Sequence, residues 1–186
     1  LYGVLFGSTF RFDKEQSIKE IYELVERVNR EYEEGKHLEK MPRILVTGSP
    51  SSGGAMKVIR AIEENGAVVV AYENCGGAKS CEGLVDEENP DVYDALARRY
   101  LNIPCSCMTP NKGRLDLMGK LIGEYQPDAV VEIVLHACHT YAVESTTISR
   151  FVQNEYHIPY LKIETDYSTQ DIEQINTRIA ALIEML

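Results

Sequence analysis

The chain has 186 residues and 44% of them are hydrophobic, which suits one domain with a sizeable core. Its net charge of −10 at pH 7 repels nucleic acids and acidic membrane surfaces, and no stretch gathers Lys and Arg to compensate. No apolar run is long enough to span a membrane, and no secretion leader is apparent. We therefore expect a cytoplasmic protein that binds neither nucleic acid nor membrane.

The first segment, residues 1–42, is predicted to be an N-terminal helix followed by a linker. Leu1 in place of an initiator Met favours the interpretation that this sequence starts inside a longer protein. From Lys14 to Tyr32 the pattern is that of an amphipathic helix, with a charged face opposite an apolar one. The apolar face comprises Ile18, Ile21, Val25 and Val28.

The second segment, residues 43–186, alternates between short apolar, β-rich runs and helical patterns. The predicted strands are 43–47, 67–71, 129–135 and 159–163, and the predicted helices are 55–65, 91–101, 113–125, 142–155 and 169–186. This alternation predicts an α/β fold with a parallel sheet covered on both faces. Right-handed crossovers favour a doubly wound, four-stranded sheet of flavodoxin or Rossmann type, in the order 2-1-3-4.

The chain has five cysteines, and none falls inside a predicted strand or helix: Cys75, Cys81, Cys105, Cys107 and Cys138. Ligands of open α/β sheets bind beyond the carboxyl ends of the strands, where the loops with Cys75, Cys81 and Cys138 would meet. The loop with Cys105 and Cys107 joins two helices and can fold over the same edge. An odd count without a leader argues against a disulfide framework. Thiolates from separate loops favour an iron–sulfur cluster over inert burial.

Two alternatives remain open for the residues around these cysteines. His136 and His139 flank Cys138 and could complete a mixed zinc site, although the spacing lacks the paired CxxC of four-thiolate zinc sites. They could equally be loop histidines that bond to the backbone or to a cluster sulfur. Glu144 either caps its helix or orients the loop, with capping the favoured interpretation, or it serves as an acid–base group near the cluster. We take His136 and Glu144 as the candidate catalytic residues.

The glycine-rich loop 48–54, with the sequence GSPSSGG, follows a predicted strand and opens a predicted helix. Its backbone N–H groups could hold a phosphate or carboxylate, or the glycines could be present for steric reasons alone. The loop matches neither a dinucleotide-binding nor a Walker sequence. Lys79 and Arg114 either add charge to such a site or are simply solvated.

Four motifs in order, ENCGGAKS, YLNIPCSCMTPN, HACHTYAVES and PYLKIETDYSTQDIEQINTRIAALIEML, resemble the C-terminal half of the 2-hydroxyglutaryl-CoA dehydratase D-component family. That superfamily includes 2-hydroxyacyl-CoA dehydratases, benzoyl-CoA reductase subunits and double-cubane cluster proteins. The resemblance runs from about Arg43 to the C-terminus. It implies that the family's N-terminal domain, with further cluster ligands and part of the substrate pocket, lies outside this sequence.

The resemblance also implies a cofactor, partners and ligands. The cofactor is a 4Fe–4S cluster or a bridged double cubane, and an ATP-dependent iron–sulfur activator delivers a low-potential electron to it. The substrate is an acyl-CoA or a small molecule, and the protein is a dimer. Cys138 matches the family's cluster cysteine, whereas Cys75 and Cys105 match cysteines of double-cubane members. Cys107 could replace Cys105, and Cys81 has no counterpart.

Three functions follow as alternatives. The first is the C-terminal domain of an iron–sulfur lyase or reductase, whose isolated fragment would hold a cluster poorly and be inactive. The second is a non-catalytic subunit that uses the same fold to dock an activator or partner. The third is a zinc- or nucleotide-binding α/β protein outside the family.

Overall fold

The computed structural model describes residues 2–186, which fall into two compact units, one up to Met41 and one from Pro42 onward. The first unit contains α1 (Tyr2–Ser8) and α2 (Lys14–Glu33). Helix α2 confirms the predicted amphipathic helix, and the Asp13 side chain caps its first turn by accepting a bond from the Gln16 backbone N–H at 2.9 Å. Helix α1 was not predicted, because seven residues are too few to show a clear periodicity.

The second unit is built on four parallel strands: β1 (Arg43–Gly48), β2 (Val68–Tyr72), β3 (Ala129–Leu135) and β4 (Tyr160–Thr165). Their order in the sheet is β2-β1-β3-β4, so the predicted order 2-1-3-4 is confirmed. Strands β1 and β3 are buried almost throughout, which explains why their sequences are continuous apolar runs instead of alternating ones.

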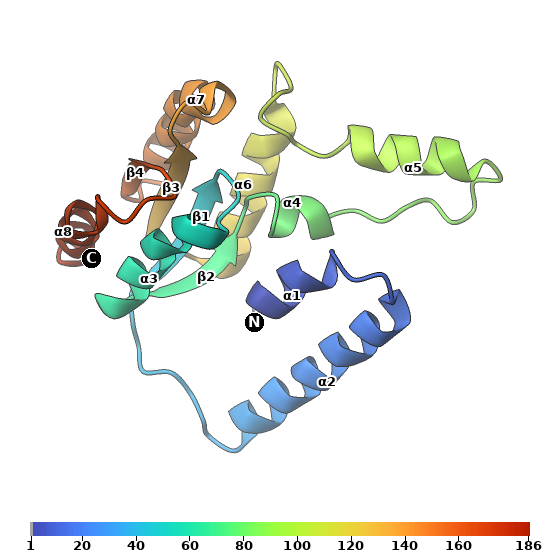
Figure 1. Cartoon of the computed structure of the whole chain (residues 1–186), viewed down its shortest axis with the longest axis horizontal. Helices are drawn as coiled ribbons and strands as arrows, with labels where there is room; N and C mark the ends of the chain where they lie inside the picture. The colour runs from blue at the N-terminus through green and yellow to red at the C-terminus, as the bar shows by residue number, and fades with distance from the viewer. Residues whose placement is uncertain (1) are drawn as a thin grey trace. The chain divides into compact units, whose positions relative to one another are not determined.

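Helices cover both faces of this sheet (Figure 1). On one face, α3 (Met56–Glu64) and α8 (Ile172–Ile183) pack in a core cluster that includes Ile62 and Ile179. On the other face, α6 (Lys112–Tyr125) and α7 (His139–Glu155) pack in a second cluster around Met118 and Ile148. The remaining helices are the short η1 (Gly53–Ala55) and α4 (Ala78–Cys81), and α5 (Val92–Leu101).

Three local predictions were wrong. Helix α4 lies inside the segment predicted as a loop, so Cys81 is helical and the expectation that every cysteine lies in a loop fails for it. Helix α7 begins at His139, three residues before the predicted start, because the chain turns directly after β3. Helix α8 begins at Ile172, three residues after the predicted start.

Gly48, at the end of β1, lies beside β3 in a conformation that leaves no room for a side chain. A Cβ atom at this position would lie 2.2 Å from the carbonyl oxygen of Ile133 in β3, and the backbone φ of +98° is itself unfavourable for other residues. Glycine is therefore required where β1 ends beside β3. No helix within residues 2–186 combines the length and apolar character needed to cross a bilayer.

Candidate functional site

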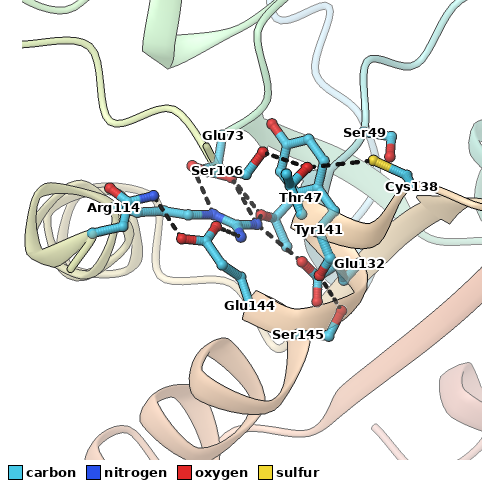
Figure 2. A network of polar contacts seen from close by, with 12 residues as sticks. Thr47, Ser49, Glu73, Ser106, Arg114, Glu132, Cys138, Tyr141, Glu144 and Ser145 are labelled. Carbon is cyan, nitrogen blue, oxygen red and sulfur yellow. Dashed lines mark hydrogen bonds and ion pairs between the residues drawn. The ribbon is translucent and has the colours of Figure 1, made fainter. Parts of the chain in front are cut away.

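The candidate site lies at the carboxyl edge of the sheet, where strand order reverses between the neighbours β1 and β3. Thr47 lies near the carboxyl end of β1, and Glu73 directly follows β2. Glu132 lies midway along β3, and the hydroxyl of Tyr160, the first residue of β4, reaches it. Helices α6 and α7 present further polar side chains to the same region (Figure 2). This edge therefore gathers charge from segments that are far apart in the sequence.

Arg114, in the first turn of α6, lies at the centre of this region and is 1% exposed. Its Nη2 donates to Glu132 Oε1 at 2.9 Å and to Thr47 Oγ1 at 3.0 Å. Its Nη1 donates to Glu144 Oε2 at 2.6 Å, and its Nε lies 3.4 Å from Glu73 Oε1. One guanidinium thus joins groups that belong to β1, β3, α7 and the segment after β2.

Lys79 forms a second buried cation next to Arg114. Its Nζ lies 2.9 Å from Glu73 Oε1 and donates to Tyr141 Oη at 3.2 Å. The Tyr141 ring contacts both cations, with Lys79 Nζ 5.0 Å and the Arg114 guanidinium carbon 4.9 Å from its centroid. These distances suit cation–π contacts, which are stronger where water is excluded.

We call Glu73, Lys79, Arg114, Glu132 and Glu144 the buried charge cluster. Three carboxylates face two cations, and each carboxylate contacts at least one of them. Burial alone would lower the pKa of Arg114, but the charges of Glu73 and Glu132 outweigh it and raise that pKa. Such a cluster is stable only while its pairs are intact, because a buried charge that loses its partner is costly.

Tyr160 closes this cluster on the β4 side by donating a hydrogen bond from its hydroxyl to Glu132. Burial raises the pKa of the Tyr160 phenol, and the neighbouring Glu132 carboxylate raises it further. The hydroxyl therefore stays protonated over a wide pH range. Glu132, inside a strand buried on both faces, thereby has a donor for each of its two oxygens.

Three cysteine-bearing segments meet at the first turn of α7, beside the buried charge cluster. Cys138 directly precedes α7, and its sulfur lies 3.7 Å from Thr140 Oγ1. The Cys75 sulfur lies 3.7 Å from Tyr141 Oη, one residue further along the helix. The loop with Cys105 is tied to the same turn, since Ser106 Oγ donates to Thr140 Oγ1 at 3.2 Å. We call Cys75, Cys105 and Cys138 the cysteine rim.

Asn111 holds the Cys105 loop from its other end. Its side-chain amide donates to the Cys105 carbonyl at 3.0 Å and to Glu144 Oε1 at 2.7 Å. Glu144 therefore joins Arg114, Asn111 and the Cys105 loop. The prediction that Glu144 caps α7 is wrong, because Cys138 occupies the N-cap position. Its contacts fit the role of orienting the loop, one of the interpretations that the sequence left open.

The cysteines differ in how readily they lose a proton. The backbone N–H of Cys107 lowers the pKa of the Cys105 thiol, and the charge of Lys79 contributes in the same direction. The hydrogen bond with Cys105 in turn raises the pKa of Cys107. Burial raises the pKa of Cys138, but hydrogen bonds from the Tyr141 backbone and from Thr140 and Ser49 outweigh it, so that pKa is lowered. The pKa of Cys105 is thus lower than that of its neighbour Cys107, so Cys105 forms a thiolate more readily.

Other predicted residues lie apart from the cysteine rim. His136 is largely exposed, and its Nδ1 lies 3.9 Å from Asp166 Oδ2 in the loop after β4. Cys81 is exposed on α4, where its sulfur lies 3.7 Å from Ser80 Oγ. All five cysteines are free thiols. Within residues 2–186, no three His, Cys, Asp or Glu side chains are arranged to hold a single metal ion.

The glycine-rich loop is used for packing. Ser49 accepts a hydrogen bond from the Leu135 backbone at 3.2 Å, and Ser51 accepts one from the Asn74 side chain at 3.2 Å. A Cβ at Gly54 would lie 2.3 Å from the Tyr167 carbonyl oxygen, so this glycine serves a close approach of two backbones. These contacts favour the steric interpretation of the loop.

Sequence reasoning missed the polar residues that carry the site. Lys79 and Arg114 were expected either to be solvated or to serve an anion site, and both are instead buried in ion pairs. Glu73, Glu132 and Tyr160 were not singled out at all. One signal was available: Glu132 is a single carboxylate in the apolar strand AVVEIVL, where a charge needs a buried partner.

Comparison with known proteins assigns this chain to a family. The family of the 2-hydroxyglutaryl-CoA dehydratase D-component matches residues 1–186, which includes the N-terminal segment that the motifs did not reach. The protein YjiM of Escherichia coli (strain K12), whose name gives a dehydratase subunit and no substrate, is 56% identical over 98% of this chain and 48% of its own length.

Two further relatives are more distant. The (R)-phenyllactyl-CoA dehydratase beta subunit of Clostridium sporogenes is 23% identical over 96% of this chain and 46% of its own length. A benzoyl-CoA reductase subunit of Thauera aromatica is 28% identical over 72% of this chain and 30% of its own length. The chain thus spans about half the length, or less, of the curated relatives it matches. The family match over its whole length shows that this chain belongs to the 2-hydroxyglutaryl-CoA dehydratase D-component family.

Proposed function

We propose that this chain is part of an iron–sulfur enzyme of the 2-hydroxyacyl-CoA dehydratase type, in which Cys75, Cys105 and Cys138 hold a 4Fe–4S cluster. The observation that carries the proposal is the meeting of three cysteine-bearing segments around one turn of α7. Two contacts bring the segments together beside Cys138: Cys75 on Tyr141, and Ser106 on Thr140. The names of the relatives support an acyl-CoA thioester as the substrate class.

The donor set fits such a cluster. The three ligands are free thiols, and thiolates are the usual ligands of iron–sulfur clusters. The lowered pKa values of Cys105 and Cys138 favour the form that binds metal.

When bound, the cluster would supply one low-potential electron to the substrate. The residues of this chain would position it. Arg114 fixes Glu144, Glu144 and Asn111 fix the Cys105 loop, and the α7 backbone fixes Cys138. His136 remains a candidate for proton transfer to a bound substrate, since its imidazole is accessible to solvent.

The proposal includes partners. An ATP-dependent iron–sulfur activator would deliver the electron, and an N-terminal domain of the same protein would cover the exposed side of the cysteine rim. Two of the relatives are named as subunits of a CoA-thioester dehydratase or reductase, which supports a dimer formed with another such chain.

Anaerobic purification of the full-length protein, followed by iron and sulfide analysis, tests the ligand assignment. We expect Cys75→Ser, Cys105→Ser and Cys138→Ser each to lose most of the iron, while Cys81→Ser, on α4, retains it. Equal iron content in Cys138→Ser and the unaltered protein would contradict the proposal. A Cys138→Ser protein that retains full activity would favour the non-catalytic docking function.

A double-cubane reductase of small molecules is the second candidate. Cys107 lies two residues from Cys105, close enough for the two thiols to share a hydrogen bond, and so offers one more thiol at the rim. Electron paramagnetic resonance of the reduced full-length protein separates the candidates. A spectrum that changes on adding a CoA thioester supports the dehydratase, whereas about eight irons per chain and no response to the thioester support the double cubane.

A further inference from the structure

The hydroxyl of Tyr141 occupies a defined place between the buried charge cluster and the cysteine rim. The residue is 5% exposed, and its Oη lies 3.2 Å from Lys79 Nζ and 3.7 Å from the Cys75 sulfur. Both the Lys79 and the Arg114 cation also contact the ring, which together with its burial leaves the side chain little freedom to turn away. Tyr141 is thus the point at which the charged interior contacts a cysteine side chain.

The direction of these hydrogen bonds follows from the donors available. An ammonium group can only donate, so the contact between Lys79 and Tyr141 makes the phenol oxygen an acceptor. The phenol proton is then left for the second neighbour, which is the Cys75 sulfur. A cation that donates to a phenol oxygen also polarises its O–H bond, which makes that proton a stronger donor.

We infer that Tyr141 is a positioning residue whose hydroxyl donates a hydrogen bond to the Cys75 sulfur and thereby raises the reduction potential of a cluster bound there. This inference rests on the proposed function, because it requires Cys75 to be a cluster ligand. A hydrogen bond to a ligating sulfur withdraws electron density from the metal, which favours the reduced state.

The same residue serves a second cysteine through a different atom. The Tyr141 backbone N–H bonds to the Cys138 thiol, and the Tyr141 carbonyl accepts a bond from Ser145 Oγ at 2.9 Å. Replacing the side chain leaves these backbone contacts in place. Tyr141→Phe therefore removes the hydrogen bonds of the hydroxyl to Cys75 and to Lys79, and it retains the aromatic ring next to the two cations.

The chain offers a matched control in Tyr160. Its hydroxyl is also buried and also bonds within the network, but to Glu132 on the β4 side. Tyr160→Phe therefore removes a buried phenol hydroxyl without touching a cysteine. A change seen in Tyr141→Phe and not in Tyr160→Phe is specific to the Tyr141 hydroxyl, which is the one of the two that contacts a cysteine sulfur.

The experiment is a redox titration of the reconstituted full-length protein, followed by electron paramagnetic resonance, with iron and sulfide measured on each sample. We expect Tyr141→Phe to retain full iron and to have a more negative midpoint potential, while Tyr160→Phe retains the potential of the unaltered protein. Site-specific replacement of Tyr141 by difluorotyrosine, a stronger donor of the same shape, should shift the potential in the opposite direction.

An unchanged potential in an iron-replete Tyr141→Phe protein would overturn the inference and leave the proposed function intact. Equal shifts in Tyr141→Phe and Tyr160→Phe would overturn it too, since the effect would then come from the network as a whole. If Tyr141→Phe fails to fold, the sign of the difluorotyrosine shift decides. An unaltered protein that binds no iron would refute the proposed function, and the inference would fall with it.

Discussion

The buried charge cluster and the cysteine rim are adjacent, yet their groups are satisfied to different degrees. Within the cluster, Arg114 bonds to three carboxylates and a hydroxyl, and Lys79 bonds to a carboxylate and a phenol. At the rim, Cys75 is exposed, Cys105 and Cys138 are half-buried, and all three remain free thiols. The chain thus completes its own charged interior, whereas the rim is built from groups that can still take a ligand.

This difference has a physical basis. A charge removed from water must have a partner within the protein, or folding becomes unfavourable. A thiol has no such requirement, because it is neutral and weakly polar until it loses a proton. Folding therefore has to pair every charge of the buried charge cluster, whereas the thiols of the cysteine rim can stay without a partner at little cost in stability.

The largest expected effect comes from removing the central cation. Arg114→Met leaves Glu73 and Glu132 without their shared partner, and breaking such buried pairs typically costs about 3–5 kcal/mol. The free energy of unfolding of the metal-free protein, measured in urea, checks this. Lys120→Met is the control on the same helix, since it breaks only a surface ion pair with Glu82 and should leave stability nearly unchanged. A loss below about 1 kcal/mol in Arg114→Met would show that the cluster is not essential to the fold.

A smaller loss of stability is expected at the edge of the buried charge cluster. Tyr160→Phe leaves one Glu132 oxygen without a donor, and an unsatisfied buried acceptor costs about 1–3 kcal/mol. Urea unfolding measures it under the same conditions. Tyr156→Phe, at the exposed C-terminal end of α7, provides a tyrosine control with little expected effect.

Stability should also fall at alkaline pH. Because burial and Glu132 raise the pKa of Tyr160 in the folded state, the phenol there keeps its proton above about pH 10, where an unfolded tyrosine loses it. Unfolding then releases a proton, so the free energy of unfolding decreases as the pH rises beyond that value. Tyr160→Phe should weaken this decrease, and Tyr141, whose pKa is raised by burial in the same direction, should account for part of what remains. An identical slope in the variant would contradict the assignment.

The contact that joins the two regions can be tested at Asn111. Asn111→Ala removes hydrogen bonds to the Cys105 carbonyl and to Glu144, with an expected loss of about 1–2 kcal/mol. It should also expose the Cys105 loop to limited proteolysis. Asn102→Ala, at the C-terminal cap of α5, is the control, and equal proteolysis rates in both variants would contradict the role of Asn111.

The smallest effect is expected at the rim itself. Cys75→Ser should change the stability of the metal-free protein by no more than about 0.5 kcal/mol, because the side chain is exposed and packs in neither core. A loss as large as that of Tyr160→Phe would mean that the rim is a structural element, and would remove the contrast between the two regions.

The sheet could be predicted because each strand is recognisable from a short stretch of sequence. Four apolar runs separated by helical patterns specify four parallel strands, and crossover handedness then limits their order. Helix α4 was not predicted, because its four residues are too few to show a helical periodicity. The burial of Lys79 and Arg114 was not predicted, because the sequence does not show which residue is the partner of a charge. Glu132 lies 18 residues from Arg114, and Glu73 lies 41 residues away. Only the folded chain brings them together, and the same holds for the contact between Tyr141 and Cys75.

The close approach at Gly48 has a consequence for mutagenesis of this domain. Since even a methyl group at residue 48 would overlap the Ile133 carbonyl, a library randomised there should yield glycine alone among folded members. The exposed neighbour Ser52 should tolerate many residues in the same selection, because its side chain makes no cap contact. The end of the central strand pair is therefore a position at which the fold admits no side chain.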